Sequence, residues 1–270
     1  ENHLDRSDRP VRRGQRGMSA IGFIGTGHIA APMVRFLSDH GHVISVSDRN
    51  ADVAADLNKS HGVRIADNQS VVDASDIVFL CVRPHLAEDI LTALNFRQDQ
   101  QFISVMAGVA LERLQALCSP AADFSLTIPF GFLEAGGCPL PAYPSKTLLE
   151  HLFSPENPVI ELASESALNQ HFAICTLLPG LLDLMSTGAG WLGDATGDQD
   201  AAALYTTQLI RGFLAALPPS DAGQLSRERD ALATDGTISL QMTTALRDGG
   251  CHDTLKQALD AINARLETKS

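Results

Sequence analysis

The residues with the clearest chemical potential form one short glycine-containing turn near the start of the chain. An apolar, β-like run over 21–24 is followed by Gly25-Thr26-Gly27-His28-Ile29-Ala30, which has the spacing G-x-G-x-x-A. Gly25 permits a tight turn, Gly27 lets a pyrophosphate approach the backbone, and Ala30 lets a helix pack closely on the sheet. The first N–H groups of that helix and its positive dipole end attract phosphate. The pattern predicts a dinucleotide phosphate site.

The segment after this turn supplies the context that the short pattern needs. Apolar residues at helical spacing predict a helix over 29–40, and Gly41 stands where a helix C′ glycine belongs. A second strand is predicted over 42–47, and Asp48 and Arg49 follow it, about 20 residues past the glycines. An acidic residue there favours the free ribose 2′-OH of NAD, whereas an arginine favours the 2′-phosphate of NADP. The two side chains therefore point to different cofactors.

The first half of the chain alternates strand-like and helix-like runs. Further strands are predicted over 63–65, 76–82 and 102–106, each separated from the next by a helical pattern. This βαβ rhythm predicts an α/β fold with a doubly wound parallel sheet, whose carboxyl-end loops hold the nucleotide. The cofactor-binding residues predicted from these loops are Gly25, Thr26, Gly27, His28, Ile29, Ser47, Asp48, Arg49, Val82, Arg83, Pro84, Ala107 and Gly108. His28 has a second interpretation, as an exposed histidine at a helix start.

The second half reads as all-helical after one more strand-like run over 158–162. A long apolar helix is predicted over 167–192, and Asp198 can cap another that ends at Pro218-Pro219. Shorter helices follow over 222–232, 238–247 and 252–266. We therefore predict a Rossmann domain over 18–163 and a helical substrate and dimerisation domain over 164–270. Residues 1–17, with five arginines and almost nothing apolar, are expected to be a disordered leader or an artificial extension before a natural start at Met18.

Composition limits the classes of partner. The formal net charge of −12 argues against nucleic acid or an anionic membrane, and no apolar run is expected to reach the length of a membrane span. The five cysteines are scattered without a C-x-x-C pair, which favours reduced thiols in a cytoplasm over disulfides or a metal site. We predict no metal, no nucleic acid and no membrane partner.

The order of these features resembles the pyrroline-5-carboxylate reductase family. Gly22-Phe23-Ile24-Gly25-x-Gly27 opens the resemblance, Val82-Arg83-Pro84 stands where the family has Val-Lys-Pro, and Ser104-Val105-Met106-Ala107-Gly108-Val109 matches its Ser-x-x-Ala-Gly-Ile/Val segment. Leu246-Arg247-Asp248-Gly249-Gly250 is similar to its Leu-Glu-x-Gly-Gly. The resemblance implies a nicotinamide-dependent imine reductase whose helical domains interlock in a homodimer. Because Asn-Arg at 48–49 accompanies NADP in the family and Arg49 matches, NADP is the expected cofactor, with NAD as the alternative.

The departures from the family fall where a substrate is expected. Its Met-Pro-Asn is Ile128-Pro129-Phe130 here, and its Gly-Ser-Gly-Pro-Ala is Thr176-Leu177-Leu178-Pro179-Gly180. Its Ser-Pro-Gly-Gly-Thr-Thr becomes the segment 234–239, which still carries hydroxyls. The resemblance places the substrate carboxylate at this segment, so Thr237 and Ser239 are the catalytic candidates, binding a small anionic substrate. The competing interpretation is that these residues only cap the next helix.

Three alternatives remain open beside this interpretation. A β-hydroxyacid-type dehydrogenase shares the two-domain plan but uses a lysine on the long helix, and no lysine occurs between Lys146 and Lys256. A nucleotide-binding sensor without turnover is the second, because the cofactor elements persist while the substrate elements are rewritten. A reduced deazaflavin as hydride donor is the third.

Overall fold

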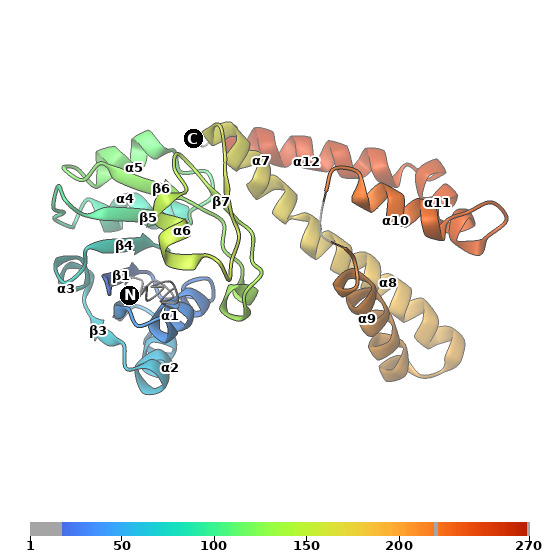
Figure 1. The fold of residues 1–270 in the computed structure, drawn as a ribbon, viewed down its shortest axis with the longest axis horizontal. Coiled ribbons are helices and arrows are strands. Elements are labelled where there is room, and N and C mark those ends of the chain that lie inside the picture. Colours follow the sequence, from blue (N-terminus) through green and yellow to red (C-terminus); the bar gives the residue numbers. More distant parts are fainter. Residues whose placement is uncertain (1–17, 219–220, 269–270) are drawn as a thin grey trace, which may run out of the picture. The chain divides into compact units, whose positions relative to one another are not determined.

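The computed structural model describes residues 18–218 and 221–268 (Figure 1). It divides into two compact units, one that ends at His171 and one that runs from Phe172 to Thr268, and each is described by itself. The predicted domain boundary at 163/164 lies just ahead of helix α7 (Glu165–Cys175), within the first unit. The prediction for residues 1–17 lies outside the described residues.

The first unit is built on a six-stranded parallel sheet in the order β3-β2-β1-β4-β5-β6. The strands are β1 (Ala20–Ile24), β2 (Val43–Ser47), β3 (Arg64–Ala66), β4 (Ile77–Leu80), β5 (Gln101–Ser104) and β6 (Asp123–Leu126). Strand β1 lies between β2 and β4, with Phe23 opposite Val46 on one side and Phe79 on the other. The order reverses at β1, so a crevice opens at its carboxyl end. The predicted doubly wound sheet is confirmed, and β6 is a strand that the sequence patterns did not reveal.

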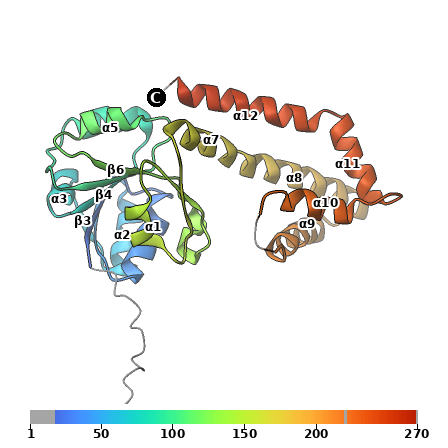
Figure 2. The same cartoon turned by 45° about the horizontal axis from the view of Figure 1, so that its top comes forward.

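Helices cover both faces of this sheet (Figures 1 and 2). On one face, α1 (Ala30–Asp39), α2 (Ala51–His61) and α6 (Thr147–Phe153) enclose the main core. The Phe23 and Phe79 rings stack there at a centroid distance of 4.5 Å. The other face carries α3 (Asn68–Asp73), α4 (Ala87–Leu91) and α5 (Leu111–Leu117). Gly22 faces α3 so closely that an added Cβ would lie 2.8 Å from a Val71 methyl group. Successive residues of β1 thus face opposite sides of the sheet, Phe23 toward the main core and Gly22 toward α3.

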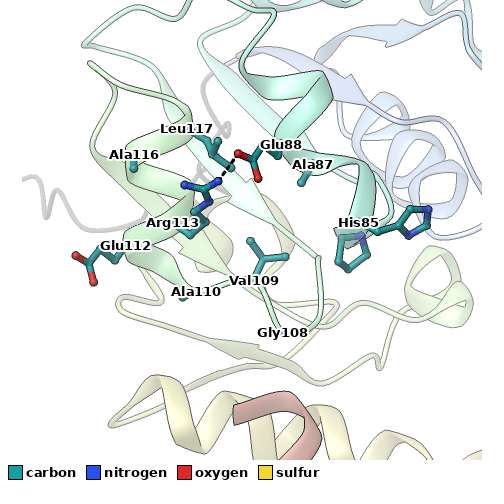
Figure 3. Close-up of a pocket in the computed structure, with 11 residues that line it drawn as sticks. His85, Ala87, Glu88, Gly108, Val109, Ala110, Glu112, Arg113, Ala116 and Leu117 are labelled. Carbon is teal, nitrogen blue, oxygen red and sulfur yellow. Dashed lines mark ion pairs between the residues drawn. The ribbon is translucent and has the colours of Figure 1, made fainter. Parts of the chain in front are cut away.

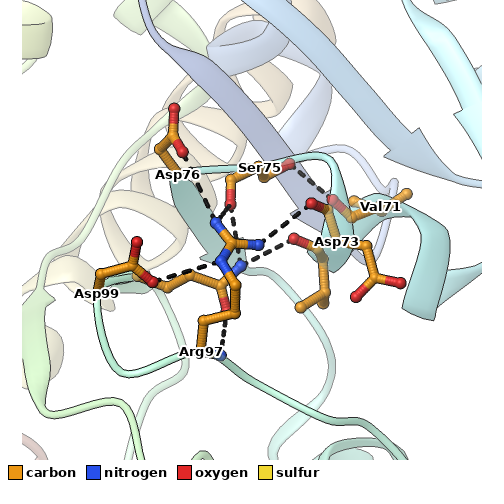
Figure 4. A network of polar contacts seen from close by, with 8 residues as sticks. Val71, Asp73, Ser75, Asp76, Arg97 and Asp99 are labelled. Carbon is orange, nitrogen blue, oxygen red and sulfur yellow. Dashed lines mark hydrogen bonds and ion pairs between the residues drawn. The ribbon is translucent and has the colours of Figure 1, made fainter.

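A polar cluster closes the amino end of the sheet, opposite the crevice (Figure 4). The fully buried Gln100 donates from Nε2 to the Val72 and Ser75 carbonyls at 2.8 and 2.9 Å, and its Oε1 accepts the Arg97 N–H at 2.9 Å. The Arg97 guanidinium donates to the Asp73 and Ser75 carbonyls at 3.1 and 3.0 Å. These carbonyls lie at and just after the end of helix α3, where the regular helical hydrogen bonds run out. The cluster therefore satisfies the C-terminus of α3 with side chains.

The rest of the first unit consists of short elements outside the main sheet. The 3₁₀ segment η2 (Gly131–Ala135) packs on α1, and β7 (Leu140–Ala142) pairs in parallel with β8 (Val159–Glu161). Another 3₁₀ turn, η1 (Pro84–Leu86), follows β4 and leads into α4. Of η2, β7 and β8, the sequence patterns had indicated β8 alone.

The second unit contains α8 (Leu177–Thr196), α9 (Gln199–Ala215), α10 (Gln224–Leu232), α11 (Ile238–Asp248) and α12 (Cys251–Glu267). Helices α8 and α9 form a hairpin (Figure 2) whose contact is so close at Gly193 that an added Cβ would overlap the Gln199 side chain. Asp198 accepts the Ala201 N–H at 2.9 Å, which confirms the predicted cap. The predicted single helix over 167–192 is wrong in one respect, because α7 ends at Cys175 and α8 starts at Leu177. Pro179 explains the break, since it has no N–H to donate to the carbonyl four residues earlier.

The helical stretch Glu165–Thr196 is long and apolar enough to cross a membrane, by length and composition only. The expectation that no apolar run reaches this length is therefore wrong. Glycine, alanine and threonine between the leucines keep the stretch apolar, and Asp183 is the one charged side chain from 173 to 190. The same composition also suits a helix that packs on a partner chain. The absence of a membrane partner stays a prediction.

Candidate functional site

The glycine turn leaves β1 in the conformation that the sequence predicts. Gly25 has a φ of +94°, which favours glycine, and an added Cβ would lie 2.6 Å from the Cys81 carbonyl oxygen. Gly27 differs, because nothing lies within 4 Å of the position its Cβ would take. Gly25 is therefore required by the fold itself. At Gly27 the space outside the turn is open to a ligand.

The first turn of α1 offers unpaired backbone donors beside this space. Ala31 donates to the Gly27 carbonyl at 3.0 Å, which is the earliest hydrogen bond of the helix, and no side chain caps the N-terminus at Ile29. The N–H groups of the residues before Ala31 therefore have no partner within the helix. These N–H groups form the positive end of the α1 helix dipole, which faces the open side of the turn, as an anion site requires.

A hollow of about 770 Å³ opens beside the turn and joins residues from three strand ends. The predicted residues Gly25, Thr26, Gly27, His28, Ile29, Arg49, Val82 and Arg83 line it, together with Ala30 of the predicted turn. Its other lining residues, Asn50, Ala51, Asp52, Cys81 and Leu86, are not among the predicted cofactor contacts. These additional residues follow directly from the strand ends, so a wider window after β2 and β4 would have found them. His28 is exposed at the rim, which is compatible with both interpretations of it.

Arg49 and Asp48 are both exposed, but Arg49 alone lines the hollow. Within the described part of the chain, no ion pair holds the Arg49 guanidinium. An arginine free to swing over a phosphate site can pair with a further phosphate in a bidentate manner. The geometry therefore favours Arg49 over Asp48 as the contact for an adenosine ribose substituent.

Two predicted contacts, Thr26 and Ser47, have side chains that turn inward. Thr26 is 2% exposed and Ser47 is fully buried, and their hydroxyls lie 3.2 Å apart. The Gly25 N–H donates to Ser47 Oγ at 2.9 Å, and Thr26 Oγ1 donates to the Ser47 carbonyl at 2.8 Å. Ser47 thus supports the turn from behind, and the Thr26 hydroxyl is engaged by Ser47.

The predicted residues after β4 and β5 divide between two hollows. Pro84 and Gly108 line a second one of about 740 Å³, bordered by α4 and the start of α5 (Figure 3). An ion pair of 2.6 Å between Arg113 Nη2 and Glu88 Oε1 crosses it. Ala107 lines neither hollow, although it is adjacent to Gly108 in the loop after β5. The strand-end loops are therefore grouped as predicted, but not around one cavity.

Cys81 is the one thiol in the first hollow, and its environment is apolar. Burial raises the pKa of the Cys81 thiol far above its ordinary value, so it is protonated at neutral pH. The described residues contain no group of three histidine, cysteine or acidic side chains placed to hold a metal ion. The chemistry available at the hollow is therefore hydrogen bonding and charge pairing by backbone N–H groups and arginines.

A dinucleotide fits this donor set. The open cradle at Gly27 admits a pyrophosphate, the α1 N-terminus supplies N–H donors, and Arg49 offers a positive charge for a ribose phosphate. The two hollows together follow the carboxyl ends of β1, β2, β4 and β5, where a Rossmann-like sheet binds nucleotides.

The predicted substrate segment lies in the second unit, at the start of α11. Thr237 is its N-cap: its hydroxyl donates to the Thr234 carbonyl at 2.7 Å and accepts the Leu240 N–H at 3.2 Å. Ser239 is exposed. A shallow hollow of about 580 Å³ is lined by Thr237 but also by Asp248, whose carboxylate opposes an anion. The competing interpretation, that the segment caps a helix, thus describes what Thr237 does in this structure.

The family model that matches the chain is described as NADP oxidoreductase, coenzyme F420-dependent, and it matches residues 20–108. This range begins at β1 and ends in the loop after β5, so it contains every predicted cofactor contact. The family model does not match the second unit.

Curated relatives extend the comparison. Pyrroline-5-carboxylate reductase 2 of Bacillus subtilis (strain 168) is 30% identical over 105 residues, which are 36% of this chain and 38% of that protein. Pyrroline-5-carboxylate reductase of Corynebacterium melassecola is 26% identical over 38% of this chain and 41% of that protein. The chain thus matches less than half the length of these two relatives. Pyrroline-5-carboxylate reductase 3 of Danio rerio is 26% identical over 91% of this chain and 89% of that protein.

Solved structures share the fold over almost the whole chain. A pyrroline-5-carboxylate reductase from Streptococcus pyogenes has a TM-score of 0.76 at 20% identity, covering 92% of this chain and 98% of that one. The Plasmodium falciparum pyrroline carboxylate reductase with NADP bound has a TM-score of 0.77 at 16% identity, covering 94% of this chain and 99% of that one. At these identities the likeness concerns the fold.

The fold and the turn define a protein with a Rossmann-like unit followed by a helical unit. In sequence the chain is similar to pyrroline-5-carboxylate reductases, and it shares the fold of solved pyrroline-5-carboxylate reductases over almost its whole length.

Proposed function

We propose that the chain is an NADP-dependent reductase that delivers a hydride to a C=N, or C=O, bond of a small carboxylate substrate. The observation that carries this proposal is the hollow at the open Gly27 cradle, into which the α1 N-terminus and Arg49 both face. The matched relatives are named pyrroline-5-carboxylate reductases, and the Plasmodium falciparum structure holds NADP. Pyrroline-5-carboxylate, and with it a place in proline synthesis, is the first candidate substrate. Phe130, in place of the family's asparagine, favours a bulkier acid.

The residues of the first unit bind and orient the cofactor. Backbone N–H groups at the α1 start hold the pyrophosphate, Arg49 pairs with the 2′-phosphate, and Gly108 leaves room above the end of β5. When bound, the nicotinamide supplies the hydride. No side chain of these hollows has to act as a strong base, because the protein contributes position and electrostatics.

The cofactor part of the proposal is tested with Gly27→Val. The new side chain enters space that only a ligand uses, so the fold should be kept while the pyrophosphate is blocked. NADP at a hundredfold excess over its dissociation constant should stabilise the wild type by about 2.7 kcal/mol, and this gain should vanish in the variant. Gly131→Val is the matched control, because that glycine also has open space but lies in η2. Calorimetry that gives wild type and Gly27→Val the same NADP affinity would refute the site.

The substrate part of the proposal concerns α11, whose N-terminus and hydroxyls form the candidate anion site. The double substitution Thr237→Ala with Ser239→Ala should raise KM or lower kcat/KM about tenfold, the loss of roughly 1.4 kcal/mol of contacts, with NADP affinity unchanged. Thr237→Ser is the control, because it keeps the cap that Thr237 provides to Leu240. Unchanged kinetics in the double variant would contradict a role in substrate binding.

A nucleotide-binding protein without turnover is the second candidate function. Two observations favour it: Asp248 borders the hollow at α11, and both functions of the Thr237 hydroxyl are used within the chain. NADPH oxidation measured against a panel of cyclic imines and keto acids separates the candidates. Tight NADPH binding without oxidation by any member of the panel would favour the second.

Assembly and location are parts of the same proposal. We propose that the helical unit forms a homodimer, supported by the apolar side chains that it leaves exposed. A cytoplasmic location is proposed on the scattered cysteines, and no two of them form a disulfide in the described chain.

A further inference from the structure

Thr26 and Ser47 have buried hydroxyl groups, and direct contact with the cofactor does not explain why these residues are polar. Thr26 is 2% exposed and Ser47 is not exposed at all. A buried hydroxyl has to find partners or destabilise the fold. The Thr26 and Ser47 hydroxyls bond to each other and to backbone groups of Gly25 and Ser47, which connects the phosphate turn to the end of β2.

The direction of every hydrogen bond in this cluster can be assigned. The Gly25 N–H can only donate, so Ser47 Oγ accepts it at 2.9 Å. The Thr26 hydroxyl donates its proton to the Ser47 carbonyl at 2.8 Å. The contact of 3.2 Å between the two hydroxyls must therefore use the Ser47 proton, with Thr26 Oγ1 as acceptor. A closed relay results, in which both hydroxyl protons have one acceptor each.

This relay continues the β1–β2 connection past the point where the strands stop pairing. The last paired residues of the two strands are Phe23 and Val46. Beyond them, side-chain hydrogen bonds hold the turn to Ser47, and the chain then passes through Asp48 to Arg49. Arg49 shares the hollow with Gly27, whereas Asp48 does not.

We propose that Thr26 and Ser47 are positioning residues that hold Arg49 at the distance from the phosphate turn that a 2′-phosphorylated dinucleotide requires. They thereby set the preference for NADP over NAD without touching either nucleotide through their hydroxyls. This inference rests on the proposed function, because it assumes that the hollow binds a dinucleotide.

The test compares Thr26→Val with Thr26→Ser. Valine keeps the shape of the side chain and removes the hydroxyl, while serine keeps the hydroxyl. Dissociation constants for NADP and NAD are measured by calorimetry on the full chain. Thr26→Val should weaken NADP binding about fivefold to tenfold and NAD binding by less than about twofold, and Thr26→Ser should restore the ratio. An equal loss for both nucleotides would overturn the inference and leave a structural role.

Arg49→Ala supplies the second measurement. If the relay acts through Arg49, adding Thr26→Val to Arg49→Ala should cause no further loss of NADP affinity. Additive losses would overturn the inference. Ser47→Ala, which removes the acceptor of the Gly25 N–H, replaces Thr26→Val if that variant does not fold. A wild type that binds neither nucleotide would overturn both the proposed function and this inference, whereas unchanged NADP to NAD ratios would overturn the inference alone.

Discussion

The two units of this chain bury their apolar side chains to very different extents. In the first unit Phe23, Phe79, Phe102 and Phe153 are all fully buried between the sheet and its helices. In the described part of the second unit the buried residues are Ala173, Gly193, Ala202 and Gln224. Large side chains there stay open to solvent, with Trp191 73% and Leu204 64% exposed. One unit therefore has a closed core, and the other has apolar surfaces without a core of comparable size.

Helix α8 shows how this difference arises. Asp183, Thr187 and Asp194 form a narrow polar strip along one side of the helix. Leu177, Leu181, Leu184 and Trp191 share the side next to this strip, and each of them is exposed. An exposed apolar surface of this kind marks an interaction site. The comparison teaches that the Rossmann-like unit buries its own core, while the helical unit leaves an apolar surface that the proposed homodimer would cover.

The largest expected effect concerns the apolar surface of the helical unit and the homodimer proposed for it. Leu184→Glu places a charge on the apolar side of α8, and it should weaken the proposed homodimer by about 4 kcal/mol, because a charge buried in an apolar interface has no partner. Thr187→Glu is the matched control on the polar strip, less than one helical turn away. Light scattering should give twice 28.8 kDa for the wild type and the control, and a lower mass for Leu184→Glu at the same concentration.

Two results would contradict this prediction. A wild type that is monomeric at micromolar concentration removes the homodimer. Recovery of the monomer on lipid vesicles would instead assign the apolar stretch Glu165–Thr196 to a membrane. Equal masses for Leu184→Glu and Thr187→Glu would place the interface elsewhere on the helical unit.

The next effect concerns the closed core of the first unit. Gln100→Ala removes three hydrogen bonds of a fully buried side chain and leaves the Arg97 N–H without the acceptor that Gln100 supplies, so the free energy of unfolding should fall by about 2 kcal/mol. Gln101→Ala is the control, because its side chain makes one exposed contact, to Asp123, and should cost less than about 1 kcal/mol. Urea unfolding measures both. Since the cluster belongs to the first unit, the oligomeric mass should stay unchanged, and a loss of the dimer in Gln100→Ala would contradict the independence of the two units.

Sequence patterns predicted the first unit well because its signals are local. The apolar runs of β1 and β4 report burial in a parallel sheet that is covered on both faces, and the glycine turn marks the end of β1. Strand β6 was missed, because Asp-Phe-Ser-Leu is short and mixed in polarity, and its strand state depends on pairing with β5. The break at Cys175–Leu177 was missed although Pro179 signals it, since the apolar periodicity on both sides hid the proline.

The candidate site shows the same division. Residue type and distance from a strand end were enough to group the turn, Arg49 and Val82 around one hollow. They were not enough to show that the Ser47 hydroxyl points inward, because side-chain direction at a strand end depends on the packing behind it. The role of Thr237 could not be resolved either, since one hydroxyl at a helix start can serve as a cap or as a ligand.

The smallest expected effect concerns an exposed helix cap of the first unit and the pH dependence of the stability that it provides. Asp67 caps α3: Oδ1 accepts the Ser70 N–H at 3.0 Å, and Oδ2 accepts the Ser70 hydroxyl at 2.6 Å. The side-chain hydrogen bond from Ser70 lowers the pKa of Asp67, followed by the backbone hydrogen bond. Because the folded pKa lies below the unfolded value, the carboxylate contributes stability above the unfolded pKa and loses it as pH falls through the folded pKa.

Asp67→Asn keeps a capping oxygen that does not titrate in this range. The midpoint of thermal unfolding should therefore be slightly higher in the wild type than in Asp67→Asn at neutral pH, and the difference should shrink as pH falls below about 4. Ser70→Ala removes the hydroxyl donor and should reduce this pH dependence. Asp67 is exposed at the surface, so solvent screening keeps the effect small. A difference between wild type and Asp67→Asn that stays constant from neutral to acidic pH would show that the Asp67 cap is not charge-assisted. The closed core would then account for the stability of the first unit without help from this carboxylate.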